Sequence, residues 1–409
     1  MRATYPSPLS LRIPAATLVL LAALAVPAAA QSSDPPAAPG PSAQAPPVSD
    51  PPPPAATPAP AANTAPQEQA KGFWESTEIG GLLDVYYDYY STQPSGDAQY
   101  RNFDTKHNQF NLSMAEIWIA KAPTSDSRAG LKLRGTVGSA ANLINAYEPG
   151  GADFLKNLEE GYVSYLAPVG KGLQVDFGKF TTPIGAEVIE AKDNWNYSRS
   201  LLFALAIPYY HTGLRLSYSP NGKVTVLGTV VNGWNNFNEN NSGKTYGAQV
   251  SVKPTGALTI VQNYMTGPEQ PSNTSDWRQL SDTIVTFNAS PALSVMANYD
   301  YGHDTVGGIG GHWQGIAGYA RFQANKVIAI APRFEWYDDH AGFTTGAVQT
   351  LKEATITLEA KALDSLLCRL EYRGDFSDQS VFKEHDGTFR DHQHSIGVSM
   401  LYFFSVKGK

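Results

Sequence analysis

The densest set of metal-binding residue types lies near the C-terminal end of the chain. In the stretch EHDGTFRDHQH, His385, Asp386, Asp391, His392 and His394 supply imidazole and carboxylate groups, which can bind metal ions. Their spacing follows no fixed ligand pattern, and a solvated loop is the alternative interpretation. We therefore expect no metal site here and no cofactor.

Catalytic chemistry has less support in the sequence. We find neither a G-x-S-x-G nucleophile elbow nor a phosphate-binding P-loop. Glu187 and Glu190 can be read as an acid/base pair, and the alternative is a pair of charges that sets the local electric field. Cys368 is the single cysteine, which excludes an internal disulfide and a multi-cysteine metal site. We predict no catalytic residues and no enzyme activity.

Charged residues recur at every second position of several short segments. This period of two is typical of β-strands whose two faces meet different surroundings. In LLDVYYDYY, Asp84 and Asp88 alternate with Leu83, Val85 and Tyr89. If the apolar faces contact lipid, the charged faces point toward water or toward partner charges, because an Arg or Lys that faces lipid at the bilayer midplane costs roughly 2–4 kcal/mol. The candidate residues for the wall of a pore are Lys132, Arg134, Arg215, Arg333, Glu335, Arg369, Glu371 and Arg373.

The elements that position these residues are strands, with almost no helix, from about residue 76 to residue 405. Their connections alternate between short turns, most of them built from Pro, Gly, Asn or Asp, and longer irregular loops. Seven short turns and eight longer loops imply sixteen strands, with both ends of the domain on the short-turn side. The longer loops fall near residues 91–107, 139–157, 181–208, 235–242, 266–276, 303–311, 340–347 and 377–392.

Three architectures are compatible with many alternating strands. A β-sandwich rarely needs so many strands in one sheet, and a propeller needs a fixed repeat that we do not find. A transmembrane barrel predicts ~10-residue strands in an even number, short turns at one end and aromatic belts. We therefore predict an all-β fold, a transmembrane antiparallel β-barrel of about 16 strands. Barrels of this size typically leave an aqueous channel, and an occluded, ion-paired interior is the alternative.

The N-terminal residues indicate export. Residues 1–30 resemble a signal peptide, with Arg2 and Arg12 before the apolar run AATLVLLAALAVPAAA and small residues before Gln31. A membrane anchor is the alternative, but the run is short and Pro27 interrupts it. Residues 31–70 are rich in Pro and Ala and predict a disordered periplasmic linker, either a passive spacer or a ligand for a partner domain. Residues 71–409 form the predicted barrel domain.

Two segments resemble a known family. GKFTTPIGAEVIE and NYSRSLLFALAIPYYHTGLR, followed by VVNGWNN, are similar to the putative beta-barrel porin 2 family of Gram-negative outer membranes. The resemblance covers nearly all of residues 75–405. It implies a porin-like barrel in the bacterial outer membrane, and it supplies no solute.

The stretch TTPIGAEVIEAKDNWNYSRSLLFALAIPYY contains the third long connection, residues 181–208. In porins of this size the third loop commonly folds into the barrel, and the resemblance implies the same here. The residue types also favour an inward-folded loop. The larger side chains of the apolar run LLFALAI are each stabilised by ~1.5–3 kcal/mol when they are fully buried, and a loop in water would leave them exposed. An external flap and a latch against a neighbouring subunit stay open. The candidate constriction residues are Glu187, Glu190, Asp193 and Arg199, and we expect Glu187 and Glu190 to be at least partly hydrated.

Two classes of function follow from this interpretation. The first is an outer-membrane channel for passive diffusion of small hydrophilic solutes or ions, without extreme ion selectivity. The second is a non-conducting barrel with a structural or adhesive role at the surface, and an outer-membrane enzyme such as a lipase is a weaker third option. The expected partners are outer-membrane lipid, the solutes, and further copies of the chain in a homo-oligomer, by analogy a trimer. The net charge of -7 shows no basic balance, so we expect no nucleic-acid partner.

Overall fold

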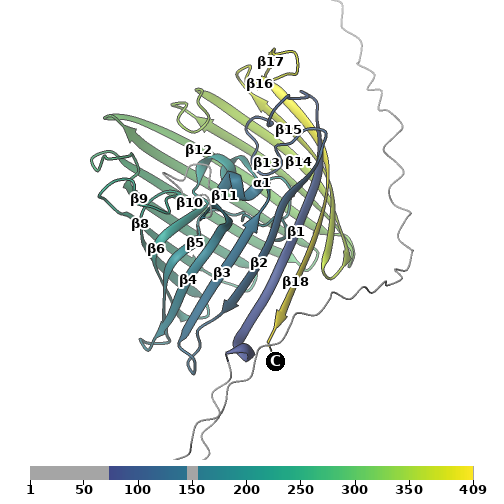
Figure 1. Ribbon diagram of the computed structural model, residues 1–409. Coiled ribbons are helices and arrows are strands. Elements are labelled where there is room, and N and C mark those ends of the chain that lie inside the picture. Colours follow the sequence, from purple (N-terminus) through teal and green to yellow (C-terminus); the bar gives the residue numbers. More distant parts are fainter. Residues whose placement is uncertain (1–72, 145–154, 409) are drawn as a thin grey trace, which may run out of the picture. The chain divides into compact units, whose positions relative to one another are not determined.

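A closed antiparallel barrel of sixteen strands dominates the computed structural model, which describes residues 73–144 and 155–408 (Figure 1). The predicted strand number is confirmed. The predicted signal peptide and Pro/Ala-rich linker lie outside the described residues. The barrel strands are β1 (Thr77–Tyr90), β2 (Phe110–Lys121), β3 (Ala129–Val137), β4 (Leu158–Ala167), β5 (Leu173–Thr181), β6 (Tyr210–Asn221), β7 (Val224–Val231), β8 (Thr245–Val252), β9 (Leu258–Pro268), β10 (Trp277–Ser290), β11 (Leu293–Val306), β12 (Ile309–Gln323), β13 (Ile328–Asp339), β14 (Gln349–Leu363), β15 (Leu366–Ser377) and β18 (His392–Lys407).

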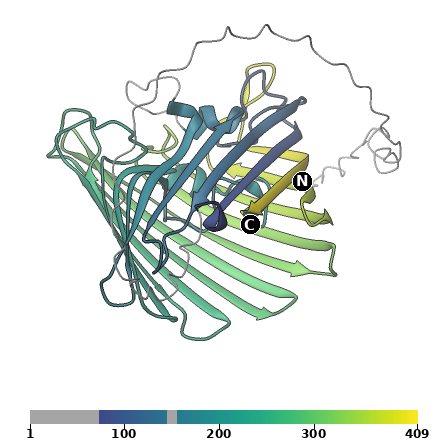
Figure 2. The same ribbon diagram turned by 60° about the horizontal axis from the view of Figure 1, so that its bottom comes forward.

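The barrel closes because its first strand, β1, pairs with its last strand, β18. All other neighbours are consecutive in sequence except β15 and β18, which are separated by a two-stranded hairpin of β16 (Phe382–Lys383) and β17 (Phe389–Arg390). The start of β1 and the end of β18 lie together at the end of the barrel with the short turns (Figure 2). We call this the turn end and the opposite one the loop end.

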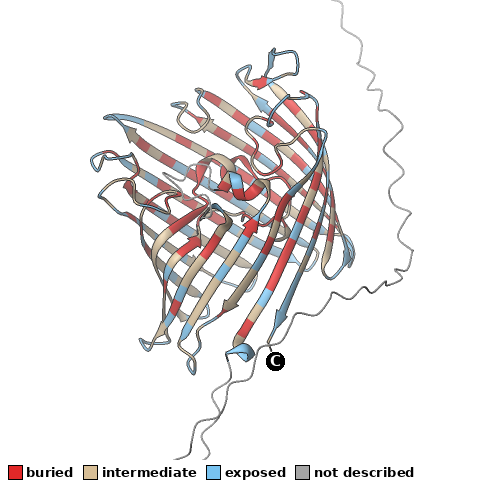
Figure 3. Cartoon of the chain, viewed as in Figure 1, coloured by how far each residue is buried: buried red, intermediate tan, exposed pale blue. Residues whose placement is uncertain are grey.

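Burial alternates along the strands, as the period of two predicts (Figure 3). In β15, Arg369, Glu371 and Arg373 are buried, whereas Leu370 and Tyr372 are exposed. A strand places successive side chains on opposite faces, so the charged set shares the inward face and the apolar set shares the outward face. The assignment of faces for this strand is confirmed.

One predicted long loop is wrong. The alternation of connections predicts a long or irregular loop at residues 303–311, but β11 and β12 meet in a two-residue turn of Gly307 and Gly308. Both glycines have positive φ, +59° and +80°, which a tight hairpin turn of the primed type requires. The strand pairing instead continues to Val306 opposite Ile309.

Several long connections contain short elements of their own. These are η1 (Trp74–Ser76) before β1, α1 (Ser139–Ile144) and η2 (Leu155–Asn157) between β3 and β4, and η3 (Ala191–Asp193) and η4 (Leu202–Ala206), a π-helical turn, between β5 and β6. None of the helices in the described residues is long and apolar enough to cross a membrane.

Candidate functional site

The connection between β5 and β6, residues 182–209, is the candidate site, and we call it the β5–β6 segment. Its two ends are adjacent, because Thr181 pairs with Tyr210 and the Thr182 amide donates a hydrogen bond to the Tyr209 carbonyl at 2.9 Å. Farther along, the Gly185 amide donates to Asp282 of β10 at 3.2 Å. The segment therefore leaves its own strands and runs along other parts of the ring.

The middle of the β5–β6 segment contacts the opposite wall of the ring. Asn196 donates to the Ala331 carbonyl of β13 at 2.8 Å and to Thr357 Oγ1 of β14 at 2.7 Å. In the ring of sixteen strands, β13 lies eight strands away from β5. Tyr197 Oη donates to Asp84 of β1 at 2.9 Å. Burial beside this carboxylate raises the pKa of Tyr197 well above its usual value, so the hydroxyl stays protonated and donates.

Three wall arginines bind the backbone carbonyls of the segment. Arg369 donates to the carbonyls of Ala191 at 2.7 Å and Asn194 at 2.6 Å. Arg333 donates to the carbonyl of Ser198 at 2.7 Å, and Arg373 donates to the carbonyl of Arg199 at 2.6 Å. Hydrogen bonds that involve a charged group are the stronger kind, so these contacts fix the backbone of the segment on β13 and β15.

Two wall glutamates bind the backbone amides of the same stretch. Glu371 accepts hydrogen bonds from the amides of Tyr197 and Ser198 at 2.7 and 2.9 Å. Glu335 accepts from the amides of Leu201 and Leu202 at 2.9 and 3.2 Å. The wall charges thus compensate backbone groups that are buried and outside regular secondary structure.

The apolar run of the segment is buried, as its composition predicts. Leu201, Leu202 and Phe203 are each at most 2% exposed. The Phe203 ring lies 5.9 Å from the ring of Phe103, which belongs to the connection between β1 and β2. From the same connection, Asn102 donates to the Ala204 carbonyl at 3.0 Å. The sequence contains no signal for this contact, because nothing in the residues around 102 indicates where that loop lies.

The expectation that Glu187 and Glu190 are partly hydrated is wrong. They are 5% and 6% exposed, because Glu187 forms an ion pair with Arg333 at 2.8 Å and Glu190 forms one with Arg134. Glu187 also accepts a hydrogen bond from the Ser200 amide at 2.7 Å, which links two parts of the β5–β6 segment.

The other two candidate constriction residues differ from each other. Arg199 is buried and donates to the carbonyls of Tyr197, at 2.6 Å, and Ile189. The Asp193 side chain is 54% exposed and lies 2.6 Å from Lys192. Of the four residues, Asp193 is the one that keeps substantial contact with water.

Two further wall cations, one on β3 and one on β6, pair with carboxylates of the neighbouring strands. Lys132 contacts Glu160 at 2.5 Å, and Arg215 contacts Asp176 at 2.9 Å. Their side chains remain 23% and 16% exposed. These cations therefore keep some contact with water, unlike Arg333, Arg369 and Arg373, whose side chains are at most 1% exposed.

Arg134 occupies a set of carboxylates that could otherwise suggest a metal site. Oxygen atoms of Glu116, Glu159 and Glu190 lie within 4.8 Å of one another. The Arg134 guanidinium pairs with Glu159 at 3.3 Å and with Glu190. A cation of the protein itself therefore already lies among these three buried carboxylates.

The histidines and aspartates of residues 385–394 do not converge. Asp391 and His392 lie 2.7 Å apart, and His394 pairs with Tyr372 at 3.0 Å. No three ligand atoms from this stretch approach one another closely within the described part of the chain. Asp386 and Asp391 are exposed, in agreement with a solvated loop.

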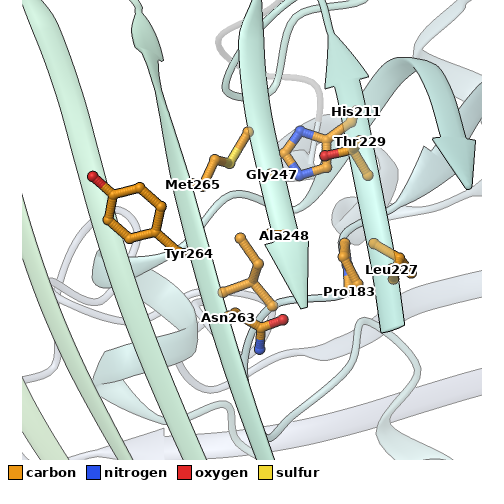
Figure 4. Close-up of a pocket in the computed structure, with 10 residues that line it drawn as sticks. Pro183, His211, Leu227, Thr229, Gly247, Ala248, Asn263, Tyr264 and Met265 are labelled. Carbon is orange, nitrogen blue, oxygen red and sulfur yellow. The ribbon is translucent and has the colours of Figure 1, made fainter. Parts of the chain in front are cut away.

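A small cavity lies where the start of the β5–β6 segment meets β6 to β9 (Figure 4). Pro183, His211, Leu227, Thr229 and Met265 are among the residues around it. Its volume is about 10 Å³, which is room for at most one water molecule. It is a packing defect and not a ligand pocket.

The residues that match a known protein family coincide with the barrel. A family model described as Putative beta-barrel porin-2, OmpL-like, matches residues 76–404. The chain belongs to this family. The matched region runs from the start of β1 to the last residues of β18, so the porin-2 family assignment covers the whole barrel. This porin-2 protein is located in the bacterial outer membrane.

Solved porin structures share the fold. An anion-selective porin from Comamonas acidovorans has a TM-score of 0.57 at 12% identity, covering 80% of this chain and 99% of that chain. A trimer form of the outer membrane protein OmpT of Vibrio cholerae has a TM-score of 0.54 at 10% identity, covering 80% of this chain and 99% of that chain. The outer membrane channel DcaP of Acinetobacter baumannii has a TM-score of 0.52 at 9% identity, covering 80% of this chain and 97% of that chain. At these identities the likeness concerns the fold alone. No curated protein matches the chain.

Proposed function

We propose that this porin-2 protein is a non-enzymatic outer-membrane channel for passive diffusion of small hydrophilic solutes or ions. We propose further that the β5–β6 segment lies inside the barrel and sets its narrowest cross-section. The observation that carries both proposals is the set of hydrogen bonds from this segment to charged residues of β13 and β15 on the inward face. An external flap would need partners on the rim, and a latch would need partners on the outward face.

The charges that solutes meet differ from the charges that hold the segment. Glu187, Arg333 and Arg369 are buried in ion pairs, so their role is to hold the β5–β6 segment against the wall. Asp193 of the segment and Lys132 and Arg215 of the wall keep exposed atoms, and we propose that they border the same aqueous gap with opposite signs. Opposite charges across a narrow aqueous gap create a transverse field that favours dipolar and hydrated solutes over apolar ones.

The direct test is conductance of the purified protein in a planar lipid bilayer. We expect discrete current steps and a modest reversal potential in asymmetric KCl. The competing function is a non-conducting barrel with a structural or adhesive role, and the dense ion-pair network on the inward face is the observation that favours it. Folded protein that inserts and gives no current steps would establish the non-conducting barrel.

Variants of Asp193 and Glu187 test whether exposed charges set the ion selectivity while buried charges stabilise the barrel. Asp193→Asn should move the reversal potential toward anions and leave the stability of the barrel unchanged, because this carboxylate is largely hydrated. Glu187→Gln should instead lower the free energy of unfolding by a few kcal/mol, since it leaves Arg333 with one carboxylate fewer in a buried site. Urea unfolding in lipid vesicles and reversal potentials measure the two effects. The same selectivity shift in both variants would contradict this division.

Leu202 tests how the segment is anchored. Leu202→Asp buries an unpaired carboxylate at a position that is 1% exposed, which costs several kcal/mol and should release the segment. We expect noisy single-channel currents or a higher mean conductance. Val188→Asp is the matched control, because this side chain in the same segment is 43% exposed. Quiet, native-like currents from a folded Leu202→Asp protein would show that the apolar run is not the anchor.

We also propose a homo-oligomer, in line with the trimer form among the structural neighbours. A groove of about 460 Å³ runs along the outward face of β1 to β4, lined by Ile79, Ile117, Ile119 and Leu133 among others. A second copy of the chain would fill this groove with apolar side chains. Native mass measurement in mild detergent tests this, and a monomer over a wide range of protein concentration would exclude it.

A further inference from the structure

Three side chains that bind metals in other proteins converge near the loop end of β12 and β13. Ligand atoms of His312, Asp338 and His340 all lie within 4.8 Å of one another. His312 belongs to β12, Asp338 is the penultimate residue of β13, and His340 follows directly. Trp313 and Asp339, which alternate with them, are fully buried, so the three side chains belong to the outward face.

The geometry leaves these groups available to a ligand. The imidazole rings of His312 and His340 are stacked, with centroids 4.5 Å apart and planes 20° apart. Over residues 73–144 and 155–408, no hydrogen bond or ion pair engages the side chain of His312, Asp338 or His340. The Asp338 carboxylate is therefore close to two imidazoles and has no cationic side chain as a partner.

We propose that His312, Asp338 and His340 form a binding site for a divalent transition-metal ion of the zinc class. Two imidazoles and one carboxylate suit such an ion, whereas Mg²⁺ and Ca²⁺ prefer all-oxygen sites. The proposal does not depend on whether the barrel conducts, since the site lies on the outward face at the rim.

Only a small movement completes the site. Zinc binds imidazole nitrogen at ~2.0–2.1 Å, so neighbouring ligand atoms of a tetrahedral site are about 3.3 Å apart. His312 and Asp338 are held on paired strands, while His340 is exposed at the start of the connection to β14. A change of the His340 rotamer supplies the approach. A water molecule can supply the remaining ligand, because His340 is exposed.

The experiment is a calorimetric titration of the untagged, full-length protein in detergent with ZnCl₂, and with MgCl₂ as the comparison. We expect one saturable zinc site per chain and no magnesium binding. Loss of a single outer-shell partner typically weakens metal binding 10–100-fold, so His312→Gln and His340→Gln should each weaken zinc binding by at least about tenfold. His385→Gln, which changes an exposed histidine in another loop, is the matched control and should bind zinc like the native protein.

Two further measurements keep the result interpretable. Both variants should retain the native circular dichroism spectrum, because the changed side chains lie on the surface and keep their polarity. A double variant, His312→Gln with His340→Gln, should abolish saturable binding. Absence of zinc binding by the native protein overturns the proposal. Zinc binding of native affinity in the double variant also overturns it, since the ion would then bind elsewhere, such as at His392 and His394.

Discussion

Arg333→Gln should lower the free energy of unfolding of the barrel by about 3–5 kcal/mol, the cost of breaking a buried ion pair from one side. The Arg333 side chain is 0% exposed, and it contacts Glu353 at 2.7 Å, Glu187 at 2.8 Å and Glu335 at 3.3 Å. Without the guanidinium, three carboxylates stay buried near one another with no cation at their centre. Urea unfolding in lipid vesicles, followed by tryptophan fluorescence, measures the loss.

A double variant tests whether charge is the cause. Arg333→Gln combined with Glu353→Gln removes one of the uncompensated carboxylates and should recover part of the lost stability, as coupled neighbours do. Arg390→Gln is the control, because its side chain is 54% exposed and its ion pair with Glu384 is worth little. A loss below about 1 kcal/mol for Arg333→Gln, the level of a surface pair, would show that water reaches this network.

Deleting the β5–β6 segment should raise the single-channel conductance and the size limit for solutes. The structure suggests a clean design, since the Thr182 amide already donates to the Tyr209 carbonyl. Replacing residues 183–208 with Asn-Gly would join these two residues by a tight hairpin turn and keep the pairing of β5 with β6. The wall arginines and glutamates that now bind the segment would then be hydrated, which a wide aqueous interior tolerates.

The control deletion removes a loop that does not contact the inward wall of β13. Residues 384–388 form the tip of the hairpin of β16 and β17, where Lys383 pairs with Phe389, and Asn-Gly can replace them. This variant should conduct like the native protein. If the deletion of residues 183–208 folds and conducts like the native protein too, the segment lies outside the current path. The external-flap or latch interpretation would then replace the constriction.

The alternation of residue types determined the barrel. In β15 the order Cys368-Arg369-Leu370-Glu371 already separates two faces, because a strand places successive side chains on opposite sides. The turns and loops between such segments gave the strand number, and the matched segments around residues 178–215 gave the family. These are local properties, and each is visible in a stretch of about ten residues.

Only the tertiary structure decided which charges are neutralised. Glu187 and Arg333 are 146 residues apart in the sequence, and no local pattern connects them. The expectation that Glu187 is hydrated failed for this reason, since burial depends on what packs against a side chain. The site of His312, Asp338 and His340 has the same origin. Its two histidines are separated in sequence by the rest of β12, one short turn and β13, and they meet because antiparallel pairing brings the loop ends of β12 and β13 together.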